Sequence, residues 1–203
     1  MAVDYTSLAA VGPARALLVC VTETTFSRPS RRASALESVG ATLLRRWESA
    51  DWPTVFAEPA IALRRTPSYS LSGATVGAQE PDAGVAASAA FGDPLRRPTP
   101  DDFLFQLQQP SLLRQTRFTR LFEGLGGPLL ILLGDELGEI VLQTAIDGFL
   151  FGHPIIIIKD AVPPGLGPSD ATEAARAAAL PLLSCFARLM TAAELMREWT
   201  GAE

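Results

Sequence analysis

Residues 134–145 read Gly134-Asp135-Glu136-Leu137-Gly138-Glu139-Ile140-Val141-Leu142-Gln143-Thr144-Ala145, directly after the apolar run Pro128–Leu133. An apolar run that breaks at a glycine and continues with helical spacing is typical of a buried strand followed by a helix. In α/β proteins, functional groups usually lie at this kind of junction. Here the start of the helix carries no chemically reactive side chain, and this absence guides the interpretation of function.

The same pattern recurs on both sides of this stretch. Short apolar or alternating runs predict six strands, one of which contains four consecutive isoleucines and therefore fits a strand that is buried on both faces. The predicted strands lie in the segments Ala14–Val21, Thr54–Ala57, Phe103–Leu107, Leu129–Leu133, His153–Ala161 and Phe186–Thr191.

Segments with apolar residues at helical spacing separate most of these strands. The predicted helices are Ser34–Trp47, Thr116–Leu125, Leu137–Phe151, Asp170–Leu183 and Ala192–Trp199. Regular alternation of strands and helices gives a parallel sheet with helices on both faces. The predicted fold class is therefore α/β, a three-layer α/β/α sandwich with a roughly six-stranded parallel sheet of the Rossmann-like kind.

The chain length predicts a single domain. With 203 residues, 48% of them hydrophobic and 19% charged, the sequence has the composition of a globular protein with a sizeable core. Residues 66–100 are rich in Pro, Gly, Ala and Ser. We interpret this segment as an insertion within the domain, because the strand and helix alternation resumes after it.

The charge distribution argues against nucleic acid as a partner. The formal net charge is −5, and the basic pairs Arg31-Arg32, Arg45-Arg46, Arg64-Arg65 and Arg96-Arg97 are far apart in the sequence. A nucleic-acid surface needs clustered Lys and Arg. Isolated pairs of this kind are typical of solvated helix and loop positions.

The two cysteines, Cys20 and Cys185, both lie in apolar segments, where we expect each thiol to pack as a small apolar group. This usage predicts no disulfide framework and a reducing compartment. The apolar runs are shorter than the roughly 18 residues that cross a bilayer, and the first residues do not have the pattern of a signal peptide. We therefore expect a cytoplasmic protein without membrane contact.

Four segments resemble the isochorismatase-like hydrolases, the cysteine hydrolase superfamily that includes nicotinamidases and carbamoylsarcosine amidases. The segment Ala16–Phe26 is similar to the family's opening strand, which continues Asp-Met-Gln-Asn-Asp-Phe. Gly134–Thr144 resembles the family's Gly-Val-x-Thr-x-x-Cys-Val-x-x-Thr element, and Ala145–Ala161 resembles its continuation through the fifth strand. Thr191–Leu195 fits the usual ending. The resemblance covers nearly the whole chain and implies the α/β/α fold.

The family's reaction uses an aspartate at the end of the first strand, a lysine at the end of the third and a cysteine nucleophile at the start of the fourth helix. Together the acid and the cation maintain the thiolate and move the proton. The resemblance places these three roles on Val21, Gln109 (within one residue) and Ile140. Valine and isoleucine have no ionisable group, and glutamine carries no charge. The resemblance thus implies a member with a degenerate triad.

The sequence predicts no metal site and no cofactor. Nicotinamidases bind a metal beside the triad through an Asp-x-His pair and a further His, whereas this chain has one histidine, His153. One imidazole does not build a transition-metal site alone, so we expect His153 to be structural.

Four carboxylates are alternative candidates for a catalytic role. Asp135, Glu136 and Glu139 lie at the helix start, where acids stabilise a helix without any further function, and Glu23 lies in a polar loop. One of these groups could serve as a general acid or base in a divergent hydrolase.

Two functions therefore remain open at this point. The first is a non-catalytic binding or assembly protein, a pseudoenzyme of the superfamily. The alternative is a divergent hydrolase that acts on a small amide or enol-ether substrate through other groups. The resemblance also implies a homo-oligomer, either a dimer or a tetramer, and leaves a small-molecule ligand open.

Overall fold

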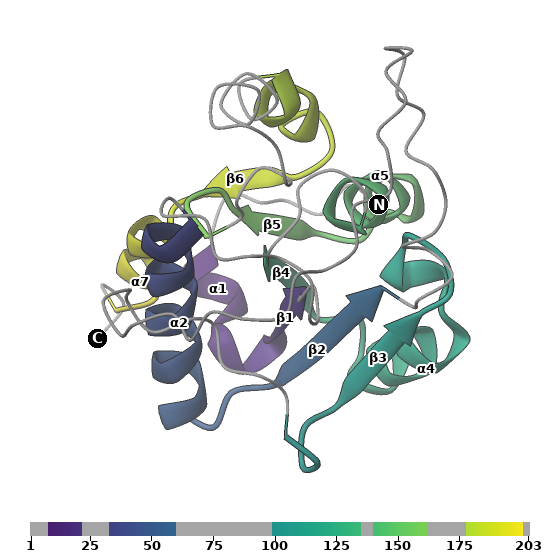
Figure 1. Ribbon diagram of the computed structural model, residues 1–203, viewed down its shortest axis with the longest axis horizontal. Coiled ribbons are helices and arrows are strands. Elements are labelled where there is room, and N and C mark those ends of the chain that lie inside the picture. The colour runs from purple at the N-terminus through teal and green to yellow at the C-terminus, as the bar shows by residue number, and fades with distance from the viewer. Residues whose placement is uncertain (1–7, 22–32, 60–98, 135–139, 162–177, 201–203) are drawn as a thin grey trace, which may run out of the picture.

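The computed structural model describes residues 8–21, 33–59, 99–134, 140–161 and 178–200 (Figure 1). These residues contain a six-stranded parallel sheet, which confirms the predicted fold class. The strands are β1 (Ala16–Val21), β2 (Thr54–Pro59), β3 (Leu104–Leu107), β4 (Leu129–Gly134), β5 (Ile155–Ile158) and β6 (Arg188–Met190).

The strands lie in the order β3-β2-β1-β4-β5-β6. The chain starts in the middle of the sheet, proceeds to one edge through β2 and β3, and then returns to the other side of β1 as β4. Between β1 and β4 the direction of winding reverses, and ligands of open α/β sheets bind beyond the carboxyl ends of the strands at this reversal. The order of strands thus points to the ends of β1 and β4.

One face of the sheet is covered by α4 (Thr116–Gly124), α5 (Leu142–Phe151) and the short 3-10 helix η2 (Leu112–Arg114). Alternate residues of β1, namely Leu17, Val19 and Val21, point to this face. They join one buried apolar cluster with residues of η2, α4 and α5. Burial on this scale contributes about 25 cal/mol for each Å² of apolar surface removed from water.

The other face is covered by α1 (Leu8–Val11), α2 (Ala33–Ser49) and α7 (Ala192–Thr200), which lie together on one side of the sheet in Figure 1. A second 3-10 turn, η1 (Pro13–Arg15), leads into β1. The indoles of Trp47, Trp52 and Trp199 pack against one another, with ring centroids 4.9 to 6.2 Å apart. Trp47 and Trp199 donate hydrogen bonds to the carbonyl oxygens of Pro53 and Leu8. The aromatic residues near the end of α2 are therefore structural.

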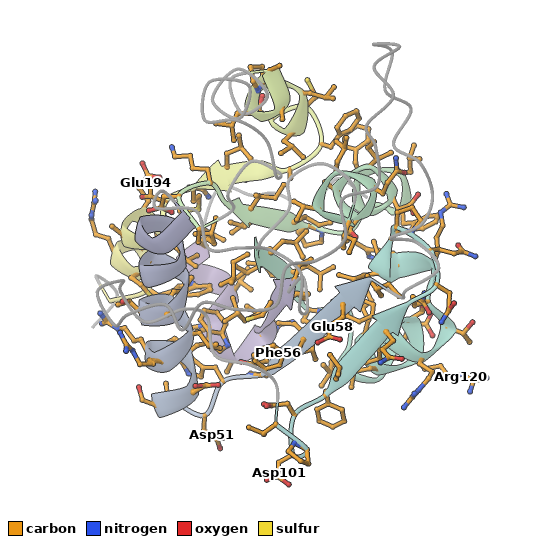
Figure 2. The ribbon with its side chains drawn as sticks, in the orientation of Figure 1. Asp51, Phe56, Glu58, Asp101, Arg120 and Glu194 are labelled. Carbon is orange, nitrogen blue, oxygen red and sulfur yellow. The ribbon has the colours of Figure 1, made fainter. Side chains whose placement is uncertain are left out.

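The start of α7 is held by a reciprocal cap. Thr191 Oγ1 accepts a hydrogen bond from the Glu194 amide (3.1 Å), and the Glu194 carboxylate accepts one from the Thr191 amide (2.7 Å). Hydrogen bonding of the Glu194 carboxylate by the backbone of Thr191, and then by its side chain, lowers the pKa of Glu194, whose side chain lies at the top of α7 in Figure 2. Asp160, just after β5, accepts a hydrogen bond from the Ala192 amide (2.9 Å). The cap thereby fixes α7 to the end of β5.

The helix predictions hold for most of the described residues. The helices predicted over 34–47, 116–125 and 192–199 are present within two residues at each end. The prediction for 137–151 is confirmed from Leu142, and Ile140 and Val141 form a wider, π-helical turn before it. Of the helix predicted over 170–183, residues 178–183 are helical and the rest lies outside the described residues. Most of the proposed insertion, residues 66–98, lies outside them as well.

One prediction about the core was wrong. We expected both thiols to be buried, and Cys20 is, beneath the α2 and α7 face, whereas Cys185 is exposed. The helix ends at residue 183, and the turn that follows directs Ser184 and Cys185 outward while Leu183 stays in the core. Apolar neighbours in the sequence did not predict burial here because the turn changes which side faces the sheet.

No helix among the described residues is long and apolar enough to cross a membrane.

Candidate functional site

The ends of β1 and β4 meet at an unusually close approach. Val21 and Gly134 are partners in the parallel register, and each is the last residue of its strand. Gly134 has φ 147°, and a Cβ at this position would lie 2.7 and 2.8 Å from the carbonyl carbon and Cα of Val21. Only glycine permits this geometry. In the sequence this glycine precedes α5, at whose start the resemblance placed the nucleophile position.

Of the three positions at which the resemblance places the triad, two lie in the same buried apolar cluster. Val21 and Ile140 are each 2% exposed, and both belong to the cluster beneath α4 and α5. The third, Gln109, follows the end of β3 and is exposed to solvent. At the carboxyl end of β3 the buried side chain is Leu107, which belongs to the same cluster as Val21 and Ile140. On this face of the sheet, the buried side chains at the ends of β1 and β3 are thus apolar.

The four alternative carboxylates, Glu23, Asp135, Glu136 and Glu139, lie outside the residues that the structure describes. His153, by contrast, is placed. Its ring packs edge-on against Phe122, with centroids 4.7 Å apart, in a partly buried position between α5 and β5.

A buried polar contact joins α5 to η2 beside this cluster. Thr144 is fully buried, and its Oγ1 accepts a hydrogen bond from the backbone amide of Leu112 (3.1 Å). The amide of Leu112 lies in the first turn of η2, where backbone donors have no partner within the helix. Thr144 therefore supplies the missing acceptor and ties the segment after β3 to α5.

A second contact between the same two elements is an ion pair. Arg114 of η2 binds the carboxylate of Asp147 through two of its guanidinium nitrogens. Nε donates to Oδ2 at 2.7 Å, and Nη2 donates to Oδ1 at 2.8 Å. Asp147 is buried and the Arg114 side chain is largely exposed. Two parallel hydrogen bonds give this pair a defined geometry.

The hydrogen bonds from Arg114 lower the pKa of the Asp147 carboxyl, an effect that burial opposes and the neighbouring Ser111 hydroxyl reinforces. Ser111 Oγ is itself buried, and among the described residues no atom is placed to form a well-aligned hydrogen bond with it. Arg114 and Asp147, with the Ser111 hydroxyl beside them, form a structural clamp that holds η2 against α5.

This clamp predicts a specific loss of stability in acid. Because the pKa of Asp147 is lower in the folded protein, the unfolded chain takes up the proton first as the pH falls. The contribution of Asp147 is complete at neutral pH, well above the pKa of about 4 in the unfolded chain, and is lost as the pH drops through the folded-state pKa. Urea unfolding between pH 3 and pH 7 should show a steeper loss for the wild type than for Asp147→Asn.

The matched control for this measurement is Glu123→Gln, an exposed acid of α4. Its acid profile should follow the wild type. Equal acid profiles of the wild type and Asp147→Asn would mean that the ion pair does not contribute to stability.

Several of these residues were missed by sequence reasoning. Ser111, Arg114, Thr144 and Asp147 are brought together by contacts that span 32 or 33 residues. Thr144 and Asp147 are three residues apart and lie on one side of α5, but nothing in the sequence pairs them with η2. Glu58, a buried acid near the end of β2, was also missed (Figure 2). It alternates with Ala57 and therefore points to the α2 side of the sheet, away from Ile140.

Within the described part of the chain, no three His, Cys, Asp or Glu side chains come close enough to hold a metal ion.

Comparison with known proteins finds likeness in structure only. No family model matches the sequence, and no curated protein matches it. A structure of an isochorismatase-family hydrolase from Chromobacterium violaceum matches with a TM-score of 0.65 at 15% identity, over 96% of this chain and 97% of that chain. N-carbamoylsarcosine amidase from Thermoplasma acidophilum matches with a TM-score of 0.56 at 16% identity, over 87% and 96%.

A third similar structure is the YcaC gene product of Escherichia coli, described as an octameric hydrolase of unknown specificity. It matches with a TM-score of 0.59 at 17% identity, over 97% of this chain and 85% of that chain. These three structures cover nearly the whole chain at low identity. The protein therefore has the fold of isochorismatase-family hydrolases.

Proposed function

We propose that this protein is an isochorismatase-like protein in which the catalytic triad has been replaced, and that it acts as a non-catalytic binding or assembly protein. The shared fold supports the first part. Function carried on a fold depends on the residues of the site, however, so the second part rests on the end of the sheet between β1 and β4.

The proposal rests on the apolar side chains that are buried at the ends of β1 and β3 and before α5. Val21 at the end of β1, Leu107 at the end of β3 and Ile140 before α5 belong to one buried cluster. A cysteine hydrolase needs an acid at the position of Val21, a thiol at that of Ile140 and a cation at that of the exposed Gln109. Apolar side chains supply neither a nucleophile nor a proton carrier.

The apolar surroundings of position 140 would also keep a cysteine introduced there from acting as a nucleophile. A thiol in apolar surroundings has a raised pKa and stays protonated, and the thiol form is a poor nucleophile. Replacing one residue therefore does not recreate the reaction. The polar contacts on the same face, from Thr144 and Asp147, are engaged in holding η2 against α5.

The test is a hydrolysis assay on the purified protein. Wild type and Ile140→Cys are incubated with isochorismate, nicotinamide and N-carbamoylsarcosine, and product is followed against a buffer blank. Both proteins should show no rate above the blank, because Val21 and the solvent-exposed Gln109 do not support a thiolate at position 140.

The divergent-hydrolase alternative predicts the opposite result. It requires wild-type turnover that one substitution abolishes, and the variants to measure are Glu23→Gln, Asp135→Asn, Glu136→Gln and Glu139→Gln, together with Glu58→Gln for the buried acid of β2. Such a result would overturn the non-catalytic proposal and identify the reacting group.

We also propose that the protein forms a homo-oligomer. The octamer described for the similar Escherichia coli protein supports this part. The large apolar side chains on the surface of the protein support it further, since contiguous apolar surface on a soluble protein commonly marks an interface.

A further inference from the structure

The carboxyl-terminal half of α5 exposes three consecutive large apolar residues. Phe149 is 57% exposed, Leu150 67% and Phe151 54%. We refer to these three residues as the α5 apolar surface. Aromatic and aliphatic side chains of this size present on the order of 300–400 Å² together when half exposed, which is comparable to the largest apolar patch of a typical monomer.

The two aromatic rings of this surface are held in place. Phe149 packs edge-on against Phe186, with centroids 5.7 Å apart, and Phe151 packs against the His153 ring at 6.3 Å. Rings that are already ordered lose little entropy when a partner covers them. Ordered, exposed aromatic side chains are also the residues that dominate protein interfaces.

The helix beneath the surface is rigidly attached to the domain. Its inner side is fixed by the contacts of Thr144 with Leu112 and of Asp147 with Arg114. Gly148 lies against Ile155 of β5, so closely that a Cβ would lie 2.9 Å from the isoleucine Cγ1. The outer side of α5 is therefore presented on a fixed element.

The lack of exposed charge on α5 indicates what kind of partner the α5 apolar surface binds. The only charged residue between Leu142 and Phe151 is Asp147, which is buried against Arg114. The exposed positions of the helix are Gln143, Phe149, Leu150 and Phe151, with Ile146 partly buried, and none of them is charged. Two copies of a chain with net charge −5 repel each other, and they meet at least cost where neither copy presents a charge.

We infer that α5 packs against α5 of a second copy of this chain across a two-fold axis. In such an isologous contact the same residues face one another, so an uncharged apolar helix surface is complementary to itself. Leu150, the most exposed of the three residues, lies at the centre of the contact, with Ile146 one turn before it. This inference rests on the proposed homo-oligomer and assigns its interface.

The first experiment measures mass in solution by sedimentation velocity between 5 and 100 µM, a range chosen to cover affinities of about 10 µM. Leu150→Glu places a carboxylate opposite its own copy and should reduce the mass to that of one 21.6 kDa chain or of a smaller assembly. The matched control is Leu125→Glu, which makes the same change at a 47% exposed leucine after α4. It should leave the mass unchanged.

The second experiment tests whether the partner is the chain itself. Leu150→Lys and Leu150→Glu should each dissociate alone and should reassociate when mixed in equal amounts, because opposite charges then face each other across the axis. Circular dichroism of each variant checks the fold, and both substitutions lie on the surface, so folded protein is expected.

The outcomes of these experiments distinguish failure of the α5 interface from failure of the proposed homo-oligomer. A wild type that sediments as one chain throughout overturns the homo-oligomer and this interface with it. A wild type that is oligomeric while Leu150→Glu keeps the same mass overturns only the α5 interface. Dissociation of both single variants without reassociation on mixing contradicts the two-fold α5 contact.

Discussion

Substitution of Gly134 by alanine should lower the free energy of unfolding by more than about 3 kcal/mol. The added Cβ would lie within 3 Å of the Val21 backbone, which cannot move aside because Val21 is paired on both sides, with β2 and β4. The φ of 147° is itself strained for any residue with a side chain. Chemical denaturation followed by the fluorescence of the buried Trp47 measures the change.

A control variant separates the steric cost of the added Cβ from the cost of placing a residue with a side chain in a left-handed backbone conformation. Gly126, after α4, has φ 79°, and a Cβ added there would meet nothing within 4 Å. Gly126→Ala should therefore cost only the left-handed backbone penalty of about 1–2 kcal/mol. If the two variants lost the same stability, the close approach of β1 and β4 would not be a constraint on folding.

Replacement of Val21 by aspartate, the residue that the resemblance implies at this position, should be as damaging. The carboxylate would enter a position that is 2% exposed and belongs to an apolar cluster containing Leu107 and Ile140. An unpaired buried charge costs about 3–5 kcal/mol. Urea unfolding at pH 7 should show a loss of this size.

The pH dependence identifies the charge as the cause. Burial raises the pKa of a carboxyl group, so the neutral acid forms in the folded variant before it forms in the unfolded chain. The loss relative to wild type should therefore shrink as the pH falls from 7 toward 4. Val21→Asn, which has the same shape without the charge, should lose less at pH 7 and show no such recovery.

A stable Val21→Asp protein at neutral pH would contradict this expectation. It would mean that a cation or water reaches the end of β1, as in a working hydrolase site, and it would weaken the non-catalytic proposal. The substitution Gln109→Lys is the complementary control. At its exposed position it should change stability by less than about 0.5 kcal/mol.

Local sequence patterns were sufficient to predict the strands and the fold class. The run Leu129–Leu133 and the four isoleucines of β5 are apolar on both alternating sides, which only a strand covered by helices on both faces accommodates. The predictions of the strands and of the fold class succeeded because each depends on residues that are close in the chain. The assignment of triad positions to Val21 and Ile140 comes from short motifs around them and stays a prediction.

Other features did not follow from the sequence because they depend on distant partners. The burial of Leu107, rather than Gln109, at the end of β3 is decided by the packing of η2, α4 and α5 over that strand. The clamp between Arg114 and Asp147 joins residues 33 apart. The exposure of Cys185 depends on where a helix ends and how the chain turns toward β6.

By itself, the sequence determined that the chain forms a parallel α/β sheet, and its resemblance to a hydrolase family led to the prediction that Val21 and Ile140 occupy positions of reactive groups. Alternation and composition act over a few residues, and this range is enough for both conclusions. Only the tertiary structure decided that β4 returns beside β1, that Val21, Leu107 and Ile140 belong to one apolar cluster, and that the outer side of α5 remains uncovered. These outcomes arise because close packing selects one arrangement of distant segments, and the side chains that are left at the surface are a result of that selection.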